Sequence, residues 1–205
     1  MIEKDNTVII LDWDDTLFPT SWVSNKKINL NDPRTKSKYA FMFNELDDHI
    51  YKILIKFKYY GRCIIVTNAT KKWVHMCTVV LPKTKKILDN DIYILSARDK
   101  YQHKYNNSFQ WKKETFKELY YDHFNNNPHH QNIISIGDAE YEHQALVELY
   151  QLNYNGTNHK YLKSIRMIKY PDIKLLLSQL KRLYMNIDLI VTSTKHIELH
   201  FKKLG

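Results

Sequence analysis

The sequence predicts an α/β protein with a three-layer, Rossmann-like parallel β-sheet and helices on both faces. Short apolar runs alternate along the chain with stretches whose apolar residues recur at helical spacing, a pattern typical of βαβ units. Hydrophobic residues make up 43% of the 205 residues and aromatic residues 13%, so the chain can bury a full core. This length, with no recognisable linker, favours one domain over residues 1–205.

Five apolar runs are expected to form the strands of this sheet. The first, residues 7–11, contains four consecutive apolar residues followed by a cluster of acids. The others are residues 63–66, 91–95, 132–136 and 161–168. The last run is more polar than the others, so we expect it at the edge of the sheet.

Amphipathic stretches separate these runs and are expected to be helices. Apolar residues over 46–57 lie on one helical face, which Gly61 can cap. A second stripe covers residues 73–80, and Pro82 stops it from running on. Further helices are expected over residues 111–120, 141–149 and 171–184, the last opening a helical C-terminal segment, 170–205.

Two polar segments show no periodicity: residues 18–39, which we call the flap, and residues 98–109. Each follows a predicted strand. In an open α/β sheet, the loops that leave the carboxyl ends of the strands line the ligand crevice. We therefore expect both segments to border a functional site.

Glycine content excludes several ways of binding phosphate. The four glycines, Gly61, Gly137, Gly156 and Gly205, lie far apart, whereas a dinucleotide fingerprint, a Walker P-loop and a kinase loop each need clustered glycines. Any phosphate chemistry in this protein must proceed without a glycine cradle.

Cysteine usage and hydropathy indicate the compartment. Cys63 and Cys77 are too few for a disulfide framework or a zinc cluster, and both lie among apolar residues, so we expect buried thiols in a reducing environment. No apolar stretch approaches the roughly 18 residues that a membrane span needs, and the N-terminal residues lack a signal-peptide pattern. We therefore expect a soluble, cytoplasmic protein without a membrane partner.

The chain is basic, with 31 Lys and Arg against 22 Asp and Glu, a net charge of +9. This charge favours an acidic partner such as nucleic acid or a phosphoprotein, or it reflects only a composition rich in Asn, Lys and Tyr. Most basic residues are scattered. The flap, however, carries one acid, Asp32, and five cations: Lys26, Lys27, Arg34, Lys36 and Lys38.

Polar residues follow three of the predicted strands at their carboxyl ends. The segments are Asp12-Trp-Asp14-Asp-Thr16, Thr67-Asn68 and Gly137-Asp138-Ala-Glu-Tyr-Glu142. If the three strands are neighbours, their acids crowd at one edge of the sheet, and uncompensated negative charge there is costly. A hard divalent cation with oxygen ligands compensates such charge, and Mg2+ fits best.

These motifs resemble those of the haloacid dehalogenase-like (HAD) phosphohydrolase superfamily, over about residues 6–150. The family's first motif, an apolar strand followed by Asp-x-Asp-x-Thr, corresponds to Asp12, Asp14 and Thr16. Its second motif, a strand followed by Thr or Ser, corresponds to Thr67. Its fourth, Gly-Asp with a further acid four residues on, corresponds to Gly137, Asp138 and Glu142, with Glu where the family usually has Asp.

The third motif of the family is a single lysine, and several lysines compete for it. We favour Lys112, because it opens the helix that precedes the fourth strand, with Lys113 and Lys104 as alternatives.

The resemblance implies a Mg2+-dependent phosphomonoester hydrolase. Asp12 would attack phosphorus and form an aspartyl-phosphate, and Asp14 would protonate the leaving oxygen and then deprotonate the attacking water. Thr67 and Lys112 would bind the phosphoryl oxygens. The metal would be held by Asp12, the Asp14 backbone carbonyl and Asp138, with Glu142 reaching it through water or holding Lys112, while Asn68 and Thr16 would contact the substrate.

The resemblance also implies a capless enzyme, because neither the flap nor residues 98–109 are long enough for a separate cap domain. Capless relatives include magnesium-dependent phosphatases. An open site of this type implies a macromolecular substrate, such as a phosphoprotein or a nucleic-acid end, or closure by a second subunit, as in a homodimer. The alternative is a catalytically silent scaffold of the same fold that binds nucleic acid or a protein partner.

Several aromatic and histidine residues have two interpretations. Trp22, in the flap, could stack on an aromatic substrate or base. Trp13 lies between two acids, so its side chain is expected to point away from them and pack. His196 and His200 could share a helical face as metal ligands, but with no third ligand nearby we expect surface histidines.

Overall fold

The computed structural model describes residues 2, 4–124, 131–152 and 160–202. In this part of the chain, six parallel strands form one sheet in the order β3-β2-β1-β4-β5-β6. The strands are β1 (Thr7–Leu11), β2 (Arg62–Thr67), β3 (Tyr93–Ser96), β4 (Gln131–Gly137), β5 (Lys160–Arg166) and β6 (Ile197–His200). The predicted α/β class with a parallel sheet is confirmed.

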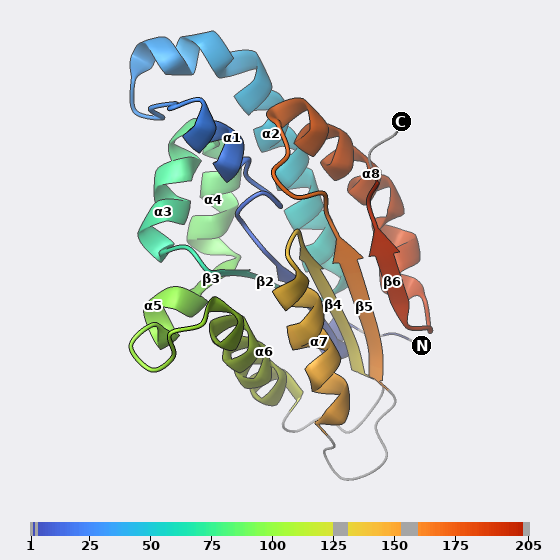
Figure 1. Ribbon diagram of the computed structural model, residues 1–205. Helices are drawn as coiled ribbons and strands as arrows, with labels where there is room; N and C mark the ends of the chain where they lie inside the picture. The colour runs from blue at the N-terminus through green and yellow to red at the C-terminus, as the bar shows by residue number, and fades with distance from the viewer. Residues whose placement is uncertain (1, 3, 125–130, 153–159, 203–205) are drawn as a thin grey trace.

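Helices cover both faces of the sheet, with α6 and α7 on one side and α2 and α8 on the other (Figure 1). Their bounds are α1 (Thr20–Asn25), α2 (Pro33–Tyr60), α3 (Lys71–Cys77), α4 (Pro82–Asn90), α5 (Ala97–Tyr101), α6 (Ser108–Phe124), α7 (Glu140–Gln151) and α8 (Ile173–Thr192). Short 3-10 helices cover Lys4–Asn6 and Thr78–Val80. Gly61 ends α2, as predicted.

The central strand β1 is buried on both faces, which explains its unbroken apolar run. Ile9 and Leu11 pack into the larger core, with residues of α2, α3, α4 and α8. Val8 and Ile10 point to the opposite face and pack into a smaller core with α6 and α7. Side chains therefore alternate between two cores along one strand.

The flap is more ordered than its polar sequence suggests. The expectation of an irregular segment is wrong, because α1 lies within it and α2 begins at Pro33. Asp32 caps α2 by accepting a hydrogen bond from the Arg34 N–H at 3.0 Å, and proline suits the first helical position because it has no N–H to satisfy. Residues 98–109 are also partly helical, since α5 and the start of α6 occupy them.

Two further expectations are wrong: the role of Pro82 and the place of the fifth strand in the sheet. Pro82 begins α4 rather than only ending the preceding helix. The fifth strand is not an edge strand, because β6 pairs with it in parallel through Lys163–Ile197 and the following positions. The segment 170–205 therefore contains a strand as well as α8.

The prediction of two buried thiols is borne out. Cys63 and Cys77 are free and buried, and burial raises the pKa of both thiols. No described helix combines the length and the apolarity that crossing a membrane requires. Gly156 and Gly205 lie outside the described residues.

Candidate active site

The three polar segments found in the sequence meet at the carboxyl edge of the sheet. β1 lies between β2 and β4, and Leu11 is in register with Ile65 on one side and Ile136 on the other. The residues that follow these three strands are therefore spatial neighbours, as the sequence analysis assumed.

Lys112 lies at the centre of this region and has no exposed surface. Its Nζ is 2.6 Å from Asp12 Oδ1 and 3.1 Å from Glu142 Oε1, and it also donates a hydrogen bond to the Val66 carbonyl oxygen. One buried ammonium thus links the end of β1, the end of β2 and the start of α7.

The two alternative lysines point elsewhere. Lys113 is half-buried and pairs with Glu148 at 2.7 Å. Lys104 lies over the Tyr105 ring, 5.2 Å from its centroid. Of the three lysines considered from the sequence, Lys112 is the one that the structure places beside Asp12.

Glu142 folds back from the first turn of α7 toward the sheet. Its Oε2 accepts a hydrogen bond from the Ala139 N–H at 3.1 Å, and its Oε1 faces Lys112. A Cβ on Gly137 would lie 2.6 Å from Glu142 Cγ, so this glycine makes room for the glutamate. The φ angle of Gly137 is not in the left-handed region, so glycine is required at this position for space and not for a special backbone conformation. Of the two roles expected for Glu142, the structure shows the contact with Lys112.

The carboxylates of the site are buried with too little positive charge to balance them. Burial raises the pKa of Asp12, with Lys112 opposing the rise and Glu142 adding to it. Burial and the charges of Asp12 and Asp15 raise the pKa of Asp138 to about 7. Burial alone would lower the pKa of Lys112, but Asp12 and Glu142 outweigh it and the net shift is upward. The charged forms of these carboxylates are therefore disfavoured unless further positive charge lies nearby.

The donor set suits a hard cation held by few protein ligands. Among the described residues, no group of three or more His, Cys, Asp and Glu side chains is arranged as metal ligands. Mg2+ is usually bound by one or two carboxylates together with water and phosphate oxygens. Asp12 and Asp138, both buried and short of positive charge, fit that requirement.

The Asp14 carboxylate accepts three hydrogen bonds. Oδ1 accepts from Thr20 Oγ1 at 2.5 Å and from the Trp73 indole Nε1 at 2.8 Å. Oδ2 accepts from Thr67 Oγ1 at 3.0 Å, and Thr67 Oγ1 in turn accepts from the Ala69 N–H at 2.9 Å. Sequence reasoning placed Asp14 and Thr67 in one site but missed Thr20 and Trp73. The sequence carries no signal for Trp73, which lies on an apolar helical stripe like a core residue.

Asp15 ties the start of the flap to the first motif. It has a positive φ of 54°, a conformation that aspartate tolerates better than most residues. The N–H of Ser21 donates to its Oδ1 at 2.8 Å, and the Ser21 hydroxyl donates to its Oδ2. The N–H of Asp15 also donates to the Phe18 carbonyl at 2.7 Å. The loop between β1 and α1 is therefore fixed by its own hydrogen bonds.

The two predicted substrate-contacting residues retain unpaired polar atoms. Asn68 Nδ2 donates to the Ser108 carbonyl at 3.1 Å. Asn68 Oδ1 and Thr16 Oγ1 are buried, and neither has a hydrogen-bond partner among the described residues. Buried polar atoms are rarely left unpaired in native proteins, so each of these two atoms has capacity for one more hydrogen bond.

Other candidates lie away from this chemistry. Trp22 does not present its ring to a substrate but packs edge-on against Tyr39 and Phe43, at centroid distances of 5.3 and 6.4 Å. Trp13 is fully buried and stacks on Phe18, as predicted. His196 and His200 are exposed, as predicted, but they lie beside and in β6 rather than on a helix.

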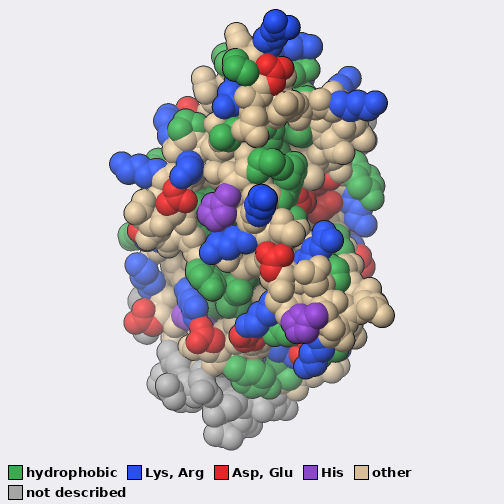
Figure 2. Space-filling model, turned by 90° about the vertical axis from the view of Figure 1, so that its left-hand side faces the viewer, with side chains coloured by type: hydrophobic (Ala, Val, Ile, Leu, Met, Phe, Trp, Pro, Cys, Tyr) green, Lys and Arg blue, Asp and Glu red, His purple; other side chains and the backbone are tan. Residues whose placement is uncertain are grey.

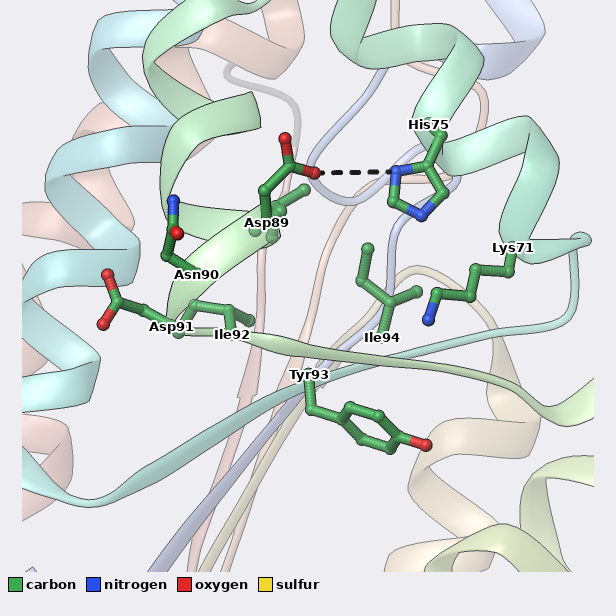
Figure 3. A pocket seen from close by; sticks show the side chains of 9 residues that line it. Lys71, His75, Asp89, Asn90, Asp91, Ile92, Tyr93 and Ile94 are labelled. Atoms are coloured by element: carbon green, nitrogen blue, oxygen red, sulfur yellow. Dashed lines mark ion pairs between the residues drawn. The ribbon is translucent and has the colours of Figure 1, made fainter.

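The surface combines charges of both signs. Figure 2 shows Lys and Arg side chains spread over one face, with acidic side chains between them. A separate cleft of about 380 Å3 lies beside β3, and Lys71, His75, Asp89 and Tyr93 are among its lining residues (Figure 3). None of the candidate site residues lines this cleft.

Comparisons of the chain with protein families, with curated proteins and with solved structures found no match. The chemistry of the site therefore rests on its own geometry.

Proposed function

We propose that this chain is a Mg2+-dependent phosphomonoester hydrolase of the HAD-like type. The observation that carries the proposal is the buried Lys112 ammonium, held between Asp12 and Glu142 at the edge where Asp14 and Thr67 are hydrogen-bonded to each other. A carboxylate nucleophile beside an ammonium and a hydroxyl donor suits a phosphoryl group, whose oxygens need positive charge and hydrogen-bond donors in the transition state.

In this proposal each residue has a defined role in the reaction. Asp12 attacks phosphorus and forms an aspartyl-phosphate as the bond to the leaving oxygen breaks. Asp14 protonates that oxygen and then removes a proton from the water that attacks the aspartyl-phosphate. Lys112 and the Thr67 hydroxyl bind the phosphoryl oxygens, and the unpaired atoms of Asn68 and Thr16 contact the substrate.

The proposed Mg2+ ligands are the carboxylates of Asp12 and Asp138 and the backbone carbonyl of Asp14. When bound, the metal neutralises charge on the phosphoryl group. Glu142 is engaged by Lys112 and by the Ala139 N–H, so its contribution is to hold the lysine.

We further propose that the site is capless and open. Between β1 and α2 the chain forms only the short helix α1, and between β3 and α6 only α5. An open site admits a macromolecular substrate, such as a phosphoprotein or a nucleic-acid end, and a second copy of the chain could cover it. The buried free thiols agree with a reducing compartment such as the cytoplasm.

The test is hydrolysis of 4-nitrophenyl phosphate with Mg2+ by the wild-type protein and by Asp12→Asn. We expect turnover by the wild type and background rates for the variant. Asp48→Asn, which removes an exposed carboxylate paired with Lys83, is the control for loss of one negative charge. Full activity of Asp12→Asn would refute the proposed mechanism.

A substrate screen separates the proposal from its alternative. Phosphopeptides, nucleotides, oligonucleotide ends and sugar phosphates would be tested with Mg2+, and Asp12→Asn would serve as the blank. Salt-dependent binding of oligonucleotides without hydrolysis of any phosphate ester would instead indicate a silent scaffold.

A further inference from the structure

Two contacts hold the Trp73 side chain, and a third holds its backbone. Its backbone N–H is capped by Thr70 Oγ1 at 3.2 Å in the first turn of α3. Its ring meets Phe18 edge-on, with centroids 6.4 Å apart, and Phe18 stacks on the buried Trp13. Its indole N–H donates to Asp14 Oδ1 at 2.8 Å. Hydrogen bonds to a carboxylate are stronger than those between neutral groups, so this rigid ring places one oxygen of Asp14.

Thr67 cannot serve Asp14 and a phosphoryl group together. A threonine hydroxyl has one proton to donate, and in this structure that proton goes to Asp14 Oδ2. Under the proposed function, the Thr67 hydroxyl turns to a phosphoryl oxygen when substrate binds. Asp14 then keeps only its donors on Oδ1, the Thr20 hydroxyl and the Trp73 N–H.

We propose that Trp73 is a positioning residue for the general acid: it holds Oδ1 of Asp14 while Thr67 releases Oδ2 to face the leaving oxygen. This inference rests on the proposed function. The Thr20 hydroxyl can rotate about its C–O bond, whereas the indole N–H is fixed in the plane of a packed ring. Trp73 therefore keeps Asp14 in place at the moment when its other contact is lost.

The consequence is a selective effect on leaving groups. A 4-nitrophenolate ion leaves without a proton, whereas an alkoxide needs one from the general acid. Misplacing a catalytic group by about 1 Å can cost about 100-fold in rate. Loss of the Trp73 N–H should therefore lower kcat/KM for an alkyl phosphate and hardly change kcat/KM for 4-nitrophenyl phosphate. This parameter reports the steps up to the aspartyl-phosphate and leaves out the later general-base step, which both substrates share.

The experiment compares kcat/KM for glycerol phosphate and 4-nitrophenyl phosphate in wild type and Trp73→Phe, with Mg2+. Phenylalanine keeps an aromatic ring against Phe18 but has no N–H. We expect kcat/KM for glycerol phosphate to fall about 10- to 100-fold, with less than about a 3-fold change in kcat/KM for 4-nitrophenyl phosphate. Trp22→Phe is the matched control, because Trp22 packs against Tyr39 and Phe43, and the ratio of the two rates should not change.

A second variant removes the N–H without altering the shape of the ring. Benzothienylalanine, incorporated site-specifically at position 73, has the bicyclic ring of tryptophan with sulfur in place of the N–H, so it tests the inference even if Trp73→Phe folds poorly. Equal losses on both substrates, or no loss, would overturn the positioning role and leave the proposed function standing. Failure of the wild type to hydrolyse either substrate would overturn both.

Discussion

Replacing Lys112 by methionine tests whether the buried ammonium supports both the fold and the site. Its Nζ lies 2.6 Å from Asp12 and 3.1 Å from Glu142, and the side chains of the three residues are at most 4% exposed. Methionine is similar in length but leaves both carboxylates buried without their cation. Removing one partner of a buried ion pair costs about 3–5 kcal/mol, and we expect the free energy of unfolding to fall by that amount at pH 8.

The loss should be smaller at pH 5. Burial raises the pKa of both Asp12 and Glu142 above their unfolded values, so their contribution to stability is present at low pH and is lost as the pH rises through the folded pKa. Without Lys112 both pKa values rise further. Protonation then relieves the buried charge at pH 5 but not at pH 8.

Urea unfolding at the two pH values measures this effect, and hydrolysis of 4-nitrophenyl phosphate should fall at least about 100-fold in the same variant. Lys113→Met is the matched control. Lys113 is the next residue and pairs with Glu148 at 2.7 Å near the surface, so its loss should cost less than about 1 kcal/mol at either pH. Equal costs for the two variants at pH 8 would refute the reasoning.

Three further predictions follow from single contacts. Gly137→Ala should lower the free energy of unfolding by about 1–3 kcal/mol, because the new Cβ would meet Glu142 Cγ at 2.6 Å; adding Glu142→Asp should recover part of the loss in urea unfolding, and additive losses would count against this. The pKa of Asp138 is raised to about 7, so its contribution to stability is lost as the pH rises through about 7; Mg2+ should therefore raise Tm more at pH 8 than at pH 5, and equal shifts would argue against binding there. Lys163 is fully buried and donates to the Val191 carbonyl at 2.7 Å, with a pKa lowered by burial to about 8. Its charged form opposes folding below that pH, so Lys163→Met should change stability at pH 7 by less than about 1 kcal/mol, and thermal unfolding that shows a much larger loss would contradict this.

The central strands were predictable because burial on both faces leaves little choice of residue. β1, β2 and β4 each contain consecutive buried apolar residues. The polar residues at their ends suggested that the three strands are neighbours, and the sheet order confirms it. β6 is different, because Ile197–His200 is paired on one side and largely exposed. An edge strand buries little apolar surface, so hydropathy gives it no clear pattern. It was missed for that reason.

The predicted helix boundaries were wrong where capping residues, and not apolar stripes, determine the start of a helix. The first turns of α2 are largely exposed, so no apolar periodicity marks them, and only the Asp32-Pro33 pair indicates where the helix begins. Proline has the same ambiguity at α4. Pro82 can end one helix or begin the next, and it begins α4.

Some residues of the candidate site could be predicted from the sequence, and others could not. Asp12, Thr67 and Asp138 lie at the carboxyl ends of neighbouring parallel strands. The order of the strands in the sheet is enough to bring these ends together. Lys112 lies on a helix, where several lysines were equivalent until packing placed one of them beside Asp12. Trp73 could not be recognised, because an indole N–H that binds Asp14 looks in sequence like any aromatic residue on an apolar stripe.

The scarcity of glycine relates directly to how this site is built. A glycine-rich loop binds phosphate through neutral backbone N–H groups, which need no counter-charge. Under the proposed function, the corresponding donor is the buried ammonium of Lys112, whose charge Asp12 and Glu142 balance. Glu142 reaches the lysine only by folding back over the end of β4, where a side chain at position 137 would block it. The space that Gly137 leaves therefore lets Glu142 pair with Lys112, which in turn contacts Asp12, the nucleophile of the proposed function.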